Sequence, residues 1–203
     1  EPCQPGSYQP GPGADSCIEA DPGNFVPSIA SSVSKKSSLG HYVPSSGSAV
    51  QTPCPIGMYT GATGAVSVEE CIFSAPGYYQ SGSEVEPCQP GSYQPGPGAD
   101  SCIEADPGNF VPTPESKFQI LCPPGYFQDE SHSVSCKSSE PGYFVPENQS
   151  TEQKKCSIGS FQSSSGATEC ELSQRGYFVD DQDRTSEKPN RLIWIVDTIL
   201  IRS

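Results

Sequence analysis

A glycine followed two residues later by an aromatic side chain recurs along almost the whole chain of 203 residues. Eight of the ten intervals between consecutive glycines of this motif are 17 residues long, and the other two, of 20 and 14 residues, add up to 34. Residues 1–27 and 86–112 are identical in sequence. A fixed interval indicates a tandem array, in which function lies on a repeated surface rather than in one pocket. The pairs are Gly6/Tyr8, Gly23/Phe25, Gly40/Tyr42, Gly57/Tyr59, Gly77/Tyr79, Gly91/Tyr93, Gly108/Phe110, Gly125/Phe127, Gly142/Phe144, Gly159/Phe161 and Gly176/Phe178.

Composition excludes one large hydrophobic core, because only 33% of the residues are apolar and the chain holds 20 Gly and 22 Pro. Helical repeats can also have a 34-residue period, but here a glycine stands in every half-repeat and a proline precedes it in seven of eleven, which breaks helices. Evenly spaced cysteines and aromatics are not typical of a disordered chain. We therefore predict an all-β, small disulfide-rich fold: an elongated tandem array of 17-residue half-repeats, paired into 34-residue units, over residues 1–187.

The net charge of −13 argues against nucleic acid as a partner, because phosphate binding needs clustered Lys and Arg. The only basic pairs, Lys35-Lys36 and Lys154-Lys155, are interpreted as solvated surface. No run of 18 apolar residues occurs, so no membrane insertion is predicted. Since the chain opens at Glu1 in mid-pattern, we expect a processed form or a fragment with further repeats upstream.

The ten cysteines occupy two fixed sites in the half-repeat: a first site three residues before the motif glycine, and a second site six residues before the next one. Five halves carry both cysteines and none carries only one, so the two cysteines of a half are predicted to bond each other. Each bond would close a loop of about 15 residues and stabilise the fold by about 3 kcal/mol. The predicted pairs are Cys3/Cys17, Cys54/Cys71, Cys88/Cys102, Cys122/Cys136 and Cys156/Cys170.

Persistent disulfides indicate an oxidising, extracellular or cell-surface setting. In that setting the triplet Asn148-Gln149-Ser150 is a candidate glycosylation site. Zinc is a weak alternative use of the cysteines, since no Cys-x-x-Cys motif occurs and His41 and His132 are the only histidines. We predict no cofactor and no metal.

Each half-repeat is predicted to form a small hairpin. Pro-Gly pairs such as Pro5-Gly6 favour a type II turn, with φ > 0 at the glycine. The aromatic then begins a short strand, and a second turn, as at residues 11–15, returns the chain to the second cysteine site. One such hairpin is unstable alone, so it must pack on the next.

The pattern Cys-x-x-Gly-x-aromatic, about eleven residues and a second Cys, as in Cys3-Gln4-Pro5-Gly6-Ser7-Tyr8, resembles the first module of tumour necrosis factor receptor cysteine-rich domains and the related ephrin-receptor-like repeats. The resemblance covers about 185 residues, through Cys170 and weakly into Gly176-Tyr177-Phe178. It implies an elongated extracellular rod. The alternate halves, such as 23–44 and 142–153, lack the further cysteines of those families, which removes most support for a receptor-type ligand site.

Catalysis has no sequence signature, because the two histidines stand in different repeat contexts and no thiol is left free after pairing, so no enzyme is predicted. Three acidic segments could supply oxygen ligands to calcium, but no loop has the alternating spacing and Gly of a known site. We interpret them as solvated edges. They are Glu19-Ala20-Asp21, Glu104-Ala105-Asp106 and Asp180-Asp181-Gln182-Asp183.

The aromatic residues of the eleven glycine–aromatic pairs, which we call the aromatic ladder, allow two interpretations. Half-exposed rings would form a surface for stacking on sugar rings. The preferred interpretation is that the ladder is the core, because little else apolar is present to be buried. The Ser-rich stretch 28–38 is interpreted as locally flexible, with O-glycosylation as the alternative.

Residues 188–203 form the second predicted region, an apolar tail that is too short for a transmembrane helix and rich in β-branched side chains, as expected of a strand. We expect it to add to a sheet edge of a neighbouring subunit or of its own repeats, unless the sequence is truncated there. The candidate assembly residues are Leu192, Trp194, Val196, Ile199 and Ile201.

Two functions stay open at this stage. The preferred one is an extracellular structural repeat protein, a rod, stalk or filament subunit whose main partner is itself. The alternative is a cell-surface binding module, either a receptor ectodomain or an adhesin for proteins or glycans.

Overall fold

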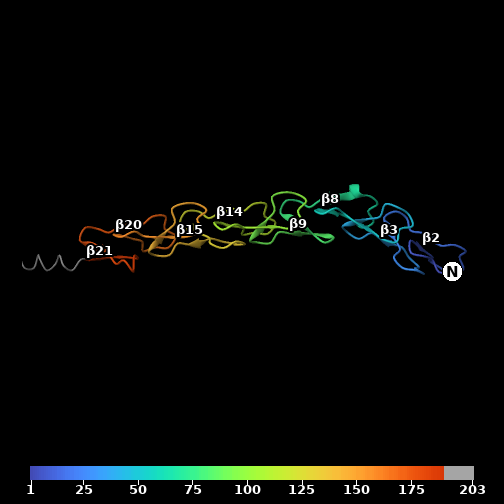
Figure 1. Ribbon diagram of the computed structural model, residues 1–203, viewed down its shortest axis with the longest axis horizontal. Coiled ribbons are helices and arrows are strands. Elements are labelled where there is room, and N and C mark those ends of the chain that lie inside the picture. Colours follow the sequence, from blue (N-terminus) through green and yellow to red (C-terminus); the bar gives the residue numbers. More distant parts are fainter. Residues whose placement is uncertain (190–203) are drawn as a thin grey trace, which may run out of the picture. The chain divides into compact units, whose positions relative to one another are not determined.

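The computed structural model describes residues 1–189, and the predicted assembly strand within 190–203 lies outside the described residues. The chain divides into two compact units. The first comprises Glu1–Gln89, Tyr93–Ile103 and Pro114–Phe118, and the second comprises Pro90–Ser92, Glu104–Thr113 and, among the described residues, 119–189. Each unit consists of the same kind of hairpin (Figure 1).

The described residues contain eleven two-stranded antiparallel hairpins and one short 3-10 turn, so the fold is all-β as predicted. Most strands have only two residues. The hairpins are β1(Ser7–Tyr8)–β2(Ile18–Glu19), β3(Asn24–Phe25)–β4(Lys35–Lys36), β5(His41–Tyr42)–β6(Thr52–Pro53), β7(Met58–Thr60)–β8(Cys71–Phe73), β9(Tyr78–Ser81)–β10(Glu84–Pro87), β11(Ser92–Tyr93)–β12(Ile103–Glu104), β13(Asn109–Phe110)–β14(Ile120–Leu121), β15(Tyr126–Phe127)–β16(Lys137–Ser138), β17(Tyr143–Phe144)–β18(Lys154–Lys155), β19(Ser160–Phe161)–β20(Glu171–Leu172) and β21(Tyr177–Val179)–β22(Glu187–Pro189).

A type II turn opens each hairpin, as predicted. The motif glycines all have positive φ, from 72° at Gly40 to 93° at Gly6. The residue after the glycine donates its N–H to the carbonyl three residues back, as Ser7 does to Gln4 at 3.1 Å. A side chain at the glycine position would be strained in this conformation, which explains why glycine recurs there.

The five predicted disulfides are confirmed: Cys3–Cys17, Cys54–Cys71, Cys88–Cys102, Cys122–Cys136 and Cys156–Cys170. In four of them the two cysteines are 14 residues apart, and in the bond between Cys54 and Cys71 they are 17 apart. Each bond joins the residue before the type II turn to the start of the second strand. The disulfides therefore act within single hairpins.

Three of the halves without cysteines close the same loop with a hydrogen bond. A glutamine at the second site accepts the backbone N–H of the residue after the first site. These bonds join Gln51 to Ser38 at 2.8 Å, Gln119 to Asp106 at 2.8 Å and Gln153 to Glu140 at 2.7 Å. Outside β7–β8 and β9–β10, the residue after the motif glycine pairs with the residue 12 positions later in both kinds of half, as in Tyr126↔Ser138 and Tyr143↔Lys155. The prediction that halves without cysteines share the hairpin is confirmed in this register.

Within each unit, backbone hydrogen bonds dock hairpins on the next one in the chain. In the second unit, β13–β14 docks on β15–β16 through four of them: Gly108 N–H to Gln128 O at 2.7 Å, Val111 N–H to Ser133 O at 2.9 Å, Cys122 N–H to Gly108 O at 2.9 Å and His132 N–H to Ala105 O at 2.9 Å. The bond donated by the motif-glycine N–H recurs in both units. Gly23 N–H donates to Val43 O in the first unit, and Gly142 N–H donates to Gln162 O in the second. Because the backbone makes these bonds, side-chain identity can vary without breaking the array.

The motif glycines from Gly6 to Gly142 also lie against the hairpin two positions further along, whereas Gly159 has no such neighbour within residues 1–189. A Cβ placed on Gly125 would lie 2.3 Å from the carbonyl oxygen of Gly166, and one on Gly6 would lie 2.1 Å from that of Gly47. In these two contacts the contacted residue is the left-handed residue of the second turn, seven residues after its own motif glycine. The glycines are thus required by close approach as well as by φ.

The buried core is a strip of small side chains. Ten of the eleven first-site residues are at most 8% exposed: Cys3, Ala20, Ser37, Cys54, Ser74, Cys88, Ala105, Cys122, Ser139 and Cys156. Val26, Val43, Val111 and Val145 complete it, each 0–1% exposed. Hairpins joined by direct backbone hydrogen bonds approach too closely for a ring to lie between them. The interpretation of the aromatic ladder as the core is therefore wrong.

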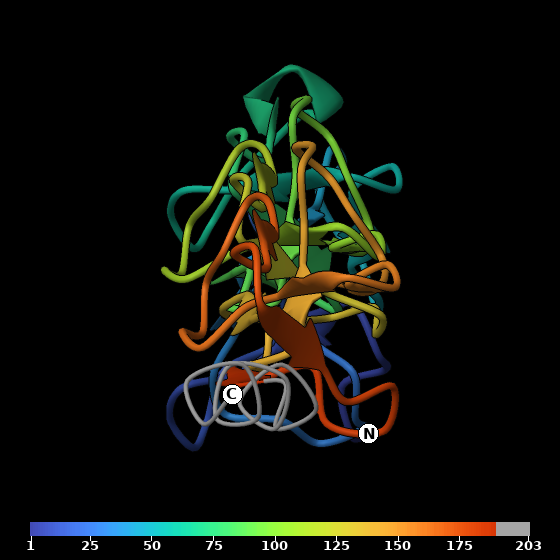
Figure 2. The ribbon, with the colours of Figure 1, turned by 90° about the vertical axis from the view of Figure 1, so that its left-hand side faces the viewer.

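The two unequal intervals correspond to one lengthened and one shortened hairpin, which together we call the register break (residues 57–87). The loop of β7–β8 contains the 3-10 turn η1 (Val68–Glu70), capped by Ser67, and in Figure 2 it projects beyond the other loops of the first unit. Hairpin β9–β10 turns through Gly82 and Ser83 alone, where a regular hairpin such as β13–β14 has nine residues between its strands.

Candidate functional surfaces

The aromatic ladder lies on the first strand of the hairpins and is half-buried. No ring is among the buried core residues, and Phe178 is 46% exposed. Across the hairpin the rings face aliphatic or long side chains, as in Tyr59↔Ile72 and Phe127↔Lys137. The partly exposed members are Tyr8, Phe25, Tyr42, Tyr59, Tyr79, Tyr93, Phe110, Phe127, Phe144 and Phe161. Each hairpin thus presents at least one partly exposed ring.

The acidic segments are exposed and bonded locally. Asp106 accepts a hydrogen bond from Gln119 at 2.8 Å, and Glu104 lies 3.5 Å from His132. In the last hairpin the Gln182 N–H and the Lys188 ammonium lower the pKa of Asp180. Among the residues the structure describes, no three His, Cys, Asp or Glu side chains are grouped as metal ligands.

The ion pair between Asp129 and Lys137 spans the loop of β15–β16, with 2.5 Å between nitrogen and oxygen. This bond lowers the pKa of Asp129 and raises that of Lys137. The Lys35-Lys36 and Lys154-Lys155 pairs form the exposed strands β4 and β18, as expected of solvated surface. Residues 28–38 lie in and beside hairpin β3–β4, which has the same pairing as the other halves.

Asn148 is exposed at the tip of the second turn of β17–β18. Its neighbour Gln149 is left-handed, with φ of 58°, and the Ser150 hydroxyl donates to the Glu147 carbonyl at 2.8 Å. The triplet therefore lies on a loop with an accessible amide. Its glycosylation stays a prediction.

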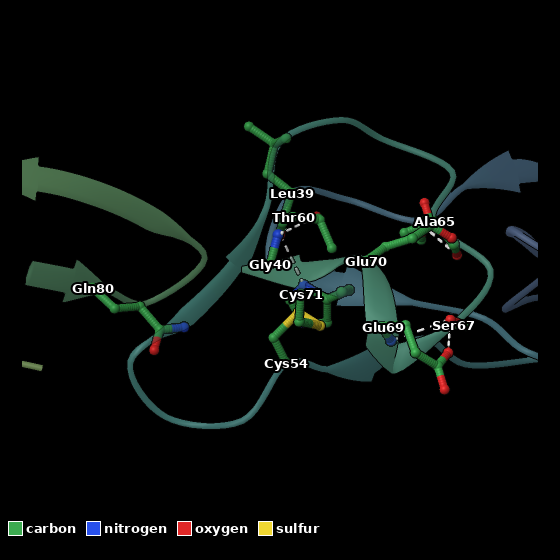
Figure 3. The surroundings of a disulfide bond; sticks show 12 residues. Leu39, Gly40, Cys54, Thr60, Ala65, Ser67, Glu69, Glu70, Cys71 and Gln80 are labelled. Atoms are coloured by element: carbon green, nitrogen blue, oxygen red, sulfur yellow. Dashed lines mark hydrogen bonds between the residues drawn. A yellow bond between two sulfur atoms is a disulfide. The ribbon is translucent and has the colours of Figure 1, made fainter. Parts of the chain in front are cut away.

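At the register break, side chains replace the backbone acceptors of the regular array. Gly40 N–H donates to the Thr60 hydroxyl at 2.9 Å, and Gly57 N–H donates to the Gln80 amide oxygen at 2.5 Å. Figure 3 shows Thr60 and Gly40 beside the Cys54–Cys71 disulfide. Thr60 is 1% exposed, so its hydroxyl is a structural part of the break.

Beside this disulfide lies an open hollow of about 630 Å³. Its wall includes His41, Pro53, Cys54, Ile56, Gln80 and Asp100. Ile56 is 79% exposed. Sequence reasoning missed this site, although the unequal glycine intervals marked its position.

No protein-family model and no curated protein matches this chain. The resemblance to tumour necrosis factor receptor and ephrin-receptor-like modules therefore stays a prediction. No helix within residues 1–189 is long and apolar enough to cross a membrane.

Proposed function

We propose that this chain is an extracellular structural repeat protein that forms part of a rod, stalk or filament. The observation that carries this proposal is the recurring set of backbone hydrogen bonds between consecutive regular hairpins, such as Gly23 N–H to Val43 O at 2.8 Å. Such docking adds length with every repeat and needs no particular surface side chain. Lengthening by repeated docking of this kind is what a rod, stalk or filament subunit requires.

The covalent architecture supports the same proposal. Five disulfides, each within one hairpin, stabilise units whose core is only a strip of small residues. A disulfide closing a loop of about 15 residues contributes about 3 kcal/mol, which compensates for a small core. Such bonds persist in oxidising surroundings, so we place the protein outside the cell or at its surface.

Electron microscopy of the purified chain tests the proposal. We expect particles of constant width whose length grows with the number of hairpins, compared between the whole chain and a chain ending at residue 121, which keeps the first three disulfides and omits Cys122 with its partner. Particles that stay compact when the array is lengthened would contradict a structural role.

The tail is the proposed assembly element, and its partner is a second copy of this chain. Deleting residues 190–203 should abolish end-to-end association and leave the five disulfides intact. Leu172→Ser is the matched control, because it removes an 81% exposed apolar side chain outside the tail. Filaments that form normally without the tail would refute this assignment, but not the extended array itself.

A second candidate, a cell-surface binding module, is favoured by the register break. Near-interchangeable repeats suit a rod, whereas one irregular pair of hairpins with a hollow suits recognition. The half-exposed rings would suit glycan stacking.

A further inference from the structure

The carbonyl of Cys54 lacks a hydrogen bond that the other first-site carbonyls have. In the regular array this carbonyl accepts an N–H from the second turn of the following hairpin, as Cys88 O does from Glu115 at 2.9 Å and Cys122 O does from Gln149 at 2.9 Å. For Cys54 no such donor occurs within residues 1–189. The reason is the register break, because the two-residue turn of β9–β10 omits the loop that would supply the donor.

Within residues 1–189, the carbonyl of Cys156 has the same need, and an arginine meets it. Cys156 O receives no backbone N–H from the described part of the last hairpin. Instead, the Arg184 guanidinium donates one N–H to Cys156 O and another to the Asp181 carboxylate. The Arg184 side chain is only 13% exposed. A first-site carbonyl and a nearby carboxylate therefore hold a guanidinium in this fold.

The hollow beside Cys54 offers the same two acceptors. Cys54 and Asp100 both line it, and Pro53 and Ile56 give it an apolar wall on which an aliphatic stem can lie. No Lys or Arg occurs anywhere in residues 37–116. That stretch carries eight acids: Glu69, Glu70, Glu84, Glu86, Asp100, Glu104, Asp106 and Glu115. The stretch that forms most of the hollow thus has acceptors and negative charge but no cation of its own.

We propose that this hollow binds an arginine side chain from a partner protein. The planar guanidinium can donate to a carbonyl and a carboxylate together, which the compact ammonium of lysine does less well. The inference does not depend on whether the array forms filaments.

The test is an NMR titration of the whole chain with the peptide acetyl-Ala-Arg-Ala-amide. The expected result is that amide signals of Gly40, Gly82 and Asp100 move, and that the uncharged citrulline peptide does not move them. Asp100→Asn should weaken binding roughly fivefold, at the upper end for exposed ion pairs. Asp15→Asn is the matched control, because Asp15 stands at the same place in the identical 27-residue block and lines a hollow with Cys3, whose carbonyl already accepts the Ala30 N–H.

A second variant tests the site without removing the acid. Ser83→Arg places a guanidinium at the turn that borders the hollow and should block the peptide. Equal affinity in the native chain and Asp100→Asn, or peptide shifts centred away from the hollow, would overturn the proposal. Unblocked binding in a folded Ser83→Arg variant would overturn it as well.

Discussion

A new disulfide in a half without cysteines tests whether all halves share one hairpin. Ala105 is the first-site residue of β13–β14 and is fully buried, as Cys88 and Cys122 are at the same site. Gln119 is its second-site partner. We expect Ala105→Cys with Gln119→Cys to form a sixth disulfide, because in the natural pairs these sites are 5.7 to 5.9 Å apart between Cα atoms.

The magnitude follows from two opposing contributions. A disulfide closing a loop of about 15 residues raises the free energy of unfolding by about 3 kcal/mol. The variant loses the two hydrogen bonds of Gln119 to the Asp106 N–H and carboxylate, both 2.8 Å, which together cost about 1 kcal/mol at this exposed place. The net gain should be about 2 kcal/mol.

Urea unfolding under oxidising conditions measures this gain, and mass mapping of unreduced peptides shows the bond. Ala105→Ser with Gln119→Ser is the control, which loses the hydrogen bonds without gaining the bridge and should fall about 1 kcal/mol below the native chain. Free thiols at both sites, or a bridged variant less stable than this control, would refute the shared hairpin.

Two further predictions concern packing and charge. Gly125→Ala should lower the free energy of unfolding in urea by about 3 kcal/mol and Gly159→Ala by about 1 kcal/mol, because both glycines have positive φ but only a side chain at residue 125 would overlap Gly166. Equal losses would contradict the contact between a motif glycine and the hairpin two positions further along. Lys137 lowers the pKa of Asp129 below its ordinary value of 3.8, so the pair stabilises the fold above pH 3.8, and this stabilisation is lost as the pH falls through the lowered pKa. Lys137→Met should therefore make the urea midpoint depend less on pH in the acid range, and an unchanged pH profile would contradict the pairing.

Local features of this chain could be predicted from its sequence. The disulfides follow from joint presence and absence of cysteines within a half, since both partners belong to one hairpin. The type II turns follow from Pro-Gly, because the two residues restrict φ directly. These predictions needed no knowledge of how hairpins pack.

Packing between hairpins could not be predicted in the same way. Backbone hydrogen bonds such as Gly91 N–H to Val111 O require no particular residue type except the glycine, so they produce no recognisable pattern in the sequence. Their short span excludes rings, which is why the aromatic ladder was wrongly placed in the core. Left-handed residues at Ala30 and His132 were equally hidden, since neither is a glycine.

The glutamine hydrogen bonds that close halves without cysteines were not predicted, although the sequence contains a signal for them. Gln51, Gln119 and Gln153 all occupy the second site of halves without cysteines. A polar residue at a half-buried site normally has a hydrogen-bond partner, and the residue after the first site was the nearest one.

Amide hydrogen exchange of the motif glycines tests the central claim most directly, namely that halves with and without cysteines dock alike. Gly108 and Gly142 belong to halves without cysteines, and Gly91 and Gly125 to halves with them, but all four donate to a carbonyl of the next hairpin at 2.7 to 2.8 Å. We predict comparable protection at all four amides. Strong protection at Gly91 and Gly125 with exchange near the unfolded rate at Gly108 and Gly142 would contradict the account, because the halves without cysteines would then be linkers between stapled units.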